Sequence, residues 1–153
     1  MELYLVQHGV AKPEQEDSAR PLSDRGRTEV ERVAHAAARL GLDVARISHS
    51  AKLRARQTAE ILAAALRPAG GVREVANLAP NDDPSGAVRL IERLSESEML
   101  VGHLPHLSRL ASLLLVGDAS RELIAFRMGG IVCLERDDSR WHVKWILTPE
   151  LAP

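Results

Sequence analysis

The sequence predicts an α/β fold in three layers, with helices covering both faces of a mostly parallel sheet and an antiparallel hairpin at one edge. Short apolar segments alternate with stretches of helical periodicity along most of the 153 residues, as in sheets whose parallel strands are joined by helices. The end of the chain differs, because two strand-like segments there enclose a polar turn. A chain of this length most often forms one domain, so we expect residues 1–153 to be a single domain.

The parallel part is predicted from short segments that contain apolar residues and are bounded by polar or turn residues. In chain order these strands are residues 3–6, 44–47, 72–75 and 99–101. Apolar residues at helical spacing predict helices at residues 24–40, 53–66, 85–94 and 105–115. Ser23 is a suitable N-cap for the first helix and Gly41 a suitable C-cap. The polar segments 12–20 and 77–84 are predicted to be loops.

The hairpin is predicted from residues 131–135 and 141–147, which flank the polar turn 137–139. Trp141 and Trp145 are separated by an even number of residues, so we expect them to share one face of the last strand. Packing in the core or at the sheet edge would explain both.

Composition excludes several classes of function. The formal net charge is −1, and Lys and Arg are dispersed among Asp and Glu, so no basic block predicts nucleic-acid binding. No apolar stretch is long enough to span a membrane, and the start lacks the basic region of a secretory signal. Cys133 is the only cysteine, which leaves no internal disulfide and fits a reducing compartment. We therefore expect a cytoplasmic protein that has no membrane partner.

Three predicted strand ends carry polar groups that could react with or bind a ligand. His8 lies between Gln7 and Gly9 after the first strand, and His103 follows the fourth strand. Between them, the second strand ends at residues 48–50, shortly before Arg54. Because the carboxyl ends of parallel strands meet at one edge of a sheet, we expect these side chains to converge there, with His8 as the reactive residue.

Four motifs occur in an order and spacing that resemble those of the histidine phosphatase superfamily, and the short chain is most similar to its small branch, the phosphohistidine phosphatases of the SixA type. The motifs are residues 5–9, 20–26, 50–58 and 102–105. The resemblance covers nearly the whole chain. It implies a phosphoglycerate mutase-like fold without a lid subdomain.

The resemblance also implies a role for each matching residue. His8 matches the nucleophilic histidine, which is transiently phosphorylated before water releases phosphate. Arg54 and His103 match residues that hold the phosphoryl oxygens, and Arg20 matches an arginine that small members bring to the pocket. Donors at those oxygens stabilise the charge that the transition state develops. The scheme requires no metal and no other cofactor.

Gln7 departs from the family pattern, which has arginine immediately before the nucleophile. Glutamine keeps an amide donor for phosphate binding but lacks the charge and the forked geometry. Loss of one well-placed donor costs on the order of 2–4 kcal/mol of transition-state stabilisation. We favour a working enzyme with an altered pocket; the alternative is a non-catalytic module that binds phosphoproteins.

The leaving group separates two enzyme hypotheses. Relatives that cleave phosphate esters use a carboxylic acid beyond the third strand, where this chain has Asp82 and Asp83. Helix capping is the simpler role for both residues. Phosphohistidine depends less on such an acid, so we expect a phosphohistidine-bearing protein as substrate, with general phosphomonoesterase activity as the alternative.

The remaining histidines have simpler interpretations. His35 and His142 are expected at the surface or in packing contacts, whereas His106 is a candidate for lining the pocket. His49 and Ser50 either support the site through a hydrogen bond or contact the substrate.

Overall fold

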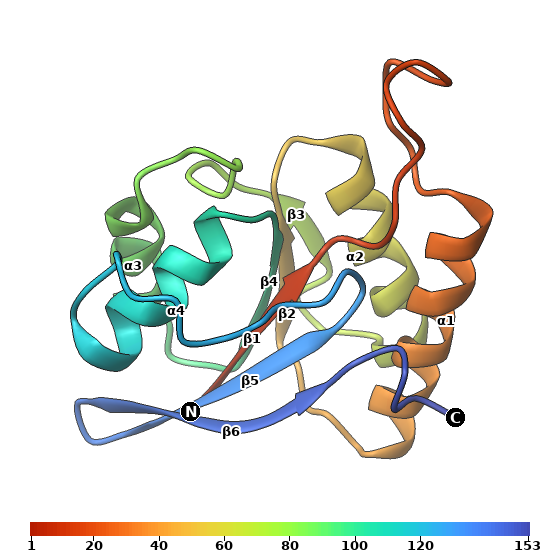
Figure 1. Ribbon diagram of the computed structural model, residues 1–153. Coiled ribbons are helices and arrows are strands. Elements are labelled where there is room, and N and C mark those ends of the chain that lie inside the picture. Colours follow the sequence, from red (N-terminus) through yellow and green to blue (C-terminus); the bar gives the residue numbers. More distant parts are fainter.

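The computed structural model describes residues 1–153 and contains a six-stranded sheet between two layers of helices (Figure 1). The strands are β1 (Glu2–Gln7), β2 (Arg46–His49), β3 (Val72–Glu74), β4 (Glu98–Gly102), β5 (Ile131–Asp137) and β6 (Arg140–Leu147). The helices are α1 (Asp24–Arg39), α2 (Leu53–Leu66), α3 (Pro84–Glu92) and α4 (His106–Val116). The predicted three-layer architecture is confirmed. None of the helices combines the length and the apolar character needed to cross a membrane.

The order of the strands places β1 in the interior of the sheet. The order is β3-β2-β4-β1-β5-β6, with parallel pairing from β3 to β1 and antiparallel pairing from β1 to β6. Strand β4 therefore separates β1 from β2, although it comes later in the chain than both. The carboxyl ends of β1, β4 and β2 lie next to one another at one edge, where open α/β sheets bind ligands.

Alternate residues of β1 belong to the two hydrophobic clusters on opposite faces of the sheet. Tyr4 and Val6 pack in the cluster that contains residues of α1 and α2, and Leu3 and Leu5 pack in the cluster that contains residues of α3 and α4. Figure 1 shows these helix pairs on opposite sides of the sheet. The period of two along a strand explains how one strand serves both clusters.

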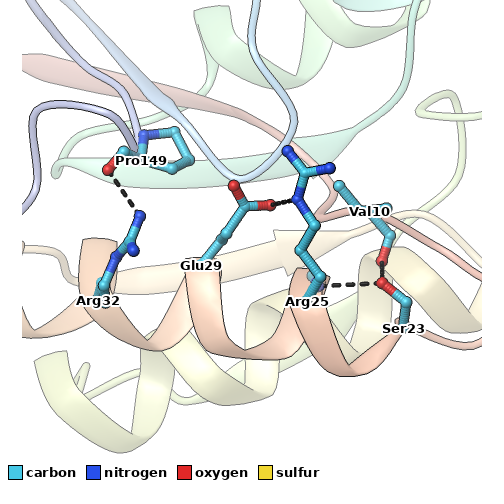
Figure 2. Close-up of polar contacts among 7 residues, drawn as sticks. Val10, Ser23, Arg25, Glu29, Arg32 and Pro149 are labelled. Carbon is cyan, nitrogen blue, oxygen red and sulfur yellow. Dashed lines mark hydrogen bonds and ion pairs between the residues drawn. The ribbon is translucent and has the colours of Figure 1, made fainter.

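Helix α1 begins at the predicted cap and is connected to the loop after β1. The Ser23 hydroxyl accepts a hydrogen bond from the Gly26 N–H at 3.0 Å and donates to the Val10 carbonyl at 3.2 Å (Figure 2). Further along the helix, Arg32 donates to the Pro149 carbonyl at 2.9 Å, which attaches the C-terminal segment (Figure 2). Leu40 is 65% exposed, so the apolar stripe ends earlier than the sequence predicts.

The expectation that Trp141 and Trp145 share a face is wrong. The β5–β6 register shifts between Cys133 and Leu134, and this bulge adds a residue to β6 between the two tryptophans. Trp145 therefore packs with the α1 and α2 cluster, with its ring centroid 6.0 Å from that of Tyr4, while Trp141 packs with the opposite cluster.

Candidate active site

Three strand ends meet at the predicted edge of the sheet. The His8 N–H continues the β1–β4 ladder by donating to the Gly102 carbonyl at 3.1 Å, and the Ser50 N–H donates to the Val101 carbonyl at 3.2 Å. The His8 and His103 rings lie side by side, with centroids 4.9 Å apart and planes at 53°. The topology thus brings together two histidines that are far apart in the sequence.

His8 has the geometry of a neutral imidazole with one nitrogen committed to the backbone. Its Nδ1 lies 2.7 Å from the Gly9 carbonyl oxygen, which can only accept, so Nδ1 carries the proton. Nε2 is then left with the lone pair. Burial lowers the pKa of His8 to about 4, and the positive charges of Arg54 and Arg20 act in the same direction. At neutral pH the ring is therefore uncharged, with a free lone pair on Nε2.

The turn after His8 is held against helix α2. The Gly9 N–H donates to the Thr58 hydroxyl at 3.0 Å, and that hydroxyl donates to the Arg54 carbonyl at 2.8 Å. A Cβ atom at Gly9 would lie 2.7 Å from a methyl group of Val30, so a larger residue does not fit there. Thr58 is fully buried and links the backbone of Gly9, the residue after His8, to that of Arg54.

Two arginines near His8 have no carboxylate partner. Arg54 lies in the first turn of α2, and burial together with the charge of Arg20 lowers its pKa. Arg20 ends the loop at residues 12–20, adopts a left-handed backbone with φ of 49°, and donates through Nε to the Lys12 carbonyl at 3.2 Å. Neither guanidinium forms an ion pair, and the Arg54 Nε is buried without a hydrogen-bond partner. Neighbouring guanidinium groups without carboxylate partners have the charge and the donors that suit an anion.

His103 is also buried and neutral. Its Nε2 lies 2.6 Å from the Ser50 hydroxyl, and its Nδ1 is buried without a partner. Burial lowers the pKa of His103 to about 3, and the neighbouring His8 and Arg54 contribute to the shift. A neutral imidazole carries one N–H group, so the ring can donate a hydrogen bond to a bound anion.

Gln7 contributes its backbone to the site, while its side chain forms no hydrogen bond. Its carbonyl accepts from the Gly129 N–H at 2.9 Å, and that same N–H lies 3.2 Å from the His8 carbonyl. The side-chain Oε1 is buried without a partner. The amide at the position of the family arginine is therefore free to bind a ligand.

The other predicted residues lie apart from this group or have local roles. Asp83 caps α3 by accepting from the Ser85 N–H at 2.9 Å, and Asp82 accepts from the Ala79 N–H at 3.0 Å. His106 is completely buried, and neither of its ring nitrogens has a hydrogen-bond partner. His35 and His142, which were predicted at the surface or in packing contacts, are both exposed. No group of three or more histidine, cysteine or carboxylate side chains capable of holding a metal ion is present.

Three residues that support the site have no role that residue type alone predicts. Thr58 and Gln57 lie one turn after Arg54, a spacing that places them on the same side of the helix. Gln57 Oε1 accepts from the Leu22 N–H at 2.7 Å and so fixes the chain just after Arg20. Gly129 lies far from His8 in the sequence, and apart from the pair Gly129-Gly130 no nearby residue pattern predicts its contact with the site.

Comparison with known proteins identifies the family. The model of the histidine phosphatase superfamily (branch 1) matches residues 3–79. An uncharacterised protein from Picosynechococcus sp. is 37% identical over 148 residues, covering 92% of this chain and 88% of that protein. The chain belongs to the histidine phosphatase superfamily.

Solved structures of histidine phosphatases share the fold over nearly the full length. The protein histidine phosphatase SixA, in complex with tungstate, has a TM-score of 0.87 at 23% identity and covers 97% of both chains. The putative phosphohistidine phosphatase SixA from Agrobacterium tumefaciens has a TM-score of 0.80 at 26% identity, again covering 97% of both chains. A putative alpha-ribazole-5'-P phosphatase from Escherichia coli has a TM-score of 0.78 at 16% identity and covers 97% of this chain and 98% of that chain. This histidine phosphatase thus has the SixA-type, phosphoglycerate mutase-like fold, and the sequence-based family prediction is confirmed.

Proposed function

We propose that this histidine phosphatase hydrolyses phosphohistidine on a protein through a phosphorylated His8 intermediate. The observation that carries the proposal is the neutral His8 ring, whose Nε2 is unprotonated, beside two guanidinium groups without carboxylate partners. A nucleophile beside an anion site is the arrangement that phosphoryl transfer requires.

The reaction has two displacements. His8 Nε2 forms a bond to phosphorus while the phosphorus–nitrogen bond of the substrate breaks, and the departing imidazole takes a proton from solvent. Water then attacks the phosphorus of phosphorylated His8, releases phosphate and restores the free ring. Arg20, Arg54 and His103 hold the phosphoryl oxygens in both transition states, and the Gln7 amide supplies a weaker donor.

The carboxylates that follow the third strand, Asp82 and Asp83, favour a phosphoramidate substrate over a phosphate ester. Hydrogen bonds from Ser85 lower the pKa of Asp83, which keeps that carboxylate ionised and unable to protonate a leaving group. Asp82 is engaged by the Ala79 N–H. The imidazole of phosphohistidine is a better leaving group than an alkoxide and depends less on an acid.

General phosphomonoesterase activity is the alternative, because a structural neighbour is a putative alpha-ribazole-5'-P phosphatase. On that hypothesis Asp82 or Asp83 donates the proton, so Asp82→Ala or Asp83→Ala should reduce turnover of esters. Our proposal predicts that neither substitution slows phosphohistidine hydrolysis.

The test is single-turnover dephosphorylation of a phosphohistidine-bearing carrier protein, with the phosphate radiolabelled. We expect wild type to release phosphate and to carry an acid-labile label during the reaction, and His8→Ala to do neither. His35→Ala is the matched control, because this histidine is exposed on α1. Saturable binding of the phosphoprotein without release by wild type would instead identify a phosphoprotein-binding module.

A further inference from the structure

Ser50 contacts His103 in a way that the proposed reaction does not use. It follows β2 directly, is 1% exposed, and places its hydroxyl oxygen 2.6 Å from His103 Nε2. The same oxygen accepts a hydrogen bond from the Lys52 N–H at 3.3 Å. Ser50 therefore lies between a fixed backbone donor and the second histidine of the site.

The hydrogen-bond partners of the Ser50 hydroxyl determine which nitrogen of His103 carries the proton. The Lys52 N–H occupies one lone pair of the Ser50 oxygen, and the Ser50 hydrogen remains available for donation. His103 is neutral, so only one of its nitrogens carries a proton. His103 Nε2 is the one acceptor in contact with that hydrogen, and donation from Ser50 to Nε2 leaves the ring proton on Nδ1.

The two tautomers of His103 present opposite groups to a ligand. Nε2 is occupied by Ser50, so Nδ1 is the nitrogen left for a phosphoryl oxygen, and it is buried without a protein partner. A bare Nδ1 lone pair would repel such an oxygen, whereas Nδ1–H would donate to it. An unpartnered buried donor next to an anion site gains its acceptor when the ligand binds.

We propose that Ser50 is a positioning residue that holds His103 in the Nδ1–H tautomer, so that His103 presents a hydrogen-bond donor to the bound phosphoryl group. The tautomer is a property of the free protein, whereas its catalytic consequence rests on the proposed phosphatase function. The side-chain hydroxyl, rather than the volume of the residue, performs this role.

The test compares Ser50→Ala with Ser50→Thr, which retains the hydroxyl, and with the control Ser48→Ala. Ser48 is a completely buried serine on β2, the strand that Ser50 follows, and its hydroxyl accepts from Arg73 Nε at 3.1 Å, outside the site. Nitrogen-15 NMR of the histidine rings reports the tautomer of His103, titration with inorganic phosphate reports anion affinity, and steady-state kinetics report kcat and KM. Thermal melting confirms that each variant is folded.

We expect wild type, Ser50→Thr and Ser48→Ala to show a protonated Nδ1, and Ser50→Ala to show a mixture of tautomers. Phosphate affinity and kcat should fall roughly tenfold in Ser50→Ala, less than for complete loss of a donor, because His103 can still reach the Nδ1–H form. A protonated Nε2 in wild type would overturn the proposal. So would a Ser50→Ala variant with the wild-type tautomer and phosphate affinity.

The spectrum and the phosphate titration do not require turnover. If wild type hydrolyses no phosphohistidine, the proposed function fails while these two measurements still decide the role of Ser50. Should Ser50→Thr not fold, the comparison of Ser50→Ala with Ser48→Ala decides it.

Discussion

Burial of His8 and His103 without a counter-ion makes stability sensitive to acid. Their pKa values are lowered from 6.5 to about 4 and about 3, chiefly by burial. Below pH 6.5 the unfolded chain binds protons that the folded protein does not, so the free energy of unfolding decreases as the pH falls. Each histidine contributes a decrease of about 1.4 kcal/mol per pH unit until its folded pKa is reached.

The prediction is checked by urea unfolding of wild type and His8→Asn between pH 7 and pH 5. The contribution of His8 is absent from the variant, so the free energy of unfolding of wild type should fall more steeply with acid. Parallel curves for the two proteins would show that His8 is not buried as a neutral group.

Gln7 is the residue whose chemistry departs most from the family pattern. Gln7→Arg restores the charge and the second donor, which should raise kcat by less than about a hundredfold if wild type is already an enzyme. Gln7→Met, of similar size without an amide, should lose turnover because it removes the remaining donor. A gain of a thousandfold or more from near zero in Gln7→Arg would contradict our proposal and indicate a phosphate-binding protein.

At the start of helix α1, close packing against the loop after β1 leaves no space for a side chain at Gly26. Gly26 lies against the loop after His8, and a Cβ atom there would be 2.0 Å from the Val10 carbonyl oxygen. Glycine to alanine inside a helix normally stabilises by about 1 kcal/mol, but this overlap forces the backbone to shift and costs about 1–3 kcal/mol or more.

We therefore expect Gly26→Ala to be destabilising and to reduce kcat, because the displaced loop carries His8. Thr28→Ala, at an exposed position on the same helix, is the control for helix propensity. Thermal melting and kinetics of both variants test this, and a Gly26→Ala protein as stable as Thr28→Ala would refute it.

Elements with a local signal were predicted well. The position of His8 and His103 at strand ends follows from short apolar runs, and the Ser23 cap follows from residue type. The faces of Trp141 and Trp145 could not be predicted, since the bulge between them depends on how β6 pairs with β5. The support from Gly129 likewise depends on a contact between distant segments.

At the scale of the whole molecule, the two hydrophobic clusters are joined through the strands that they share. Leu62 belongs to one cluster and Leu110 to the other, and both are completely buried. Strands β1 and β4 contribute alternate residues to each cluster. If the packing of one cluster is disrupted, the strands that also hold the other cluster are disrupted with it. We propose that residues 1–153 unfold as one unit.

Leu62→Ala and Leu110→Ala should each lower the free energy of unfolding by about 2–5 kcal/mol. Both should retain a single transition, seen at the same denaturant concentration by tryptophan fluorescence and by circular dichroism. Leu151→Ala, at a 69% exposed position, is the control. Two separate transitions in either core variant would argue against a single domain.

The hydrogen bond from the Gly129 N–H to the carbonyls of Gln7 and His8 has a consequence for the synthesis of the protein. His8 leaves the ribosome long before Gly129 and the strand β5 that pairs with β1. Until they emerge, one side of β1 has no neighbouring strand, and the backbone of Gln7 and His8 lacks its hydrogen bond from Gly129. On our proposal, the nascent chain therefore gains activity only after Gly129 and β5 have emerged, and a chain that stops before Gly129 leaves one edge of β1 unpaired.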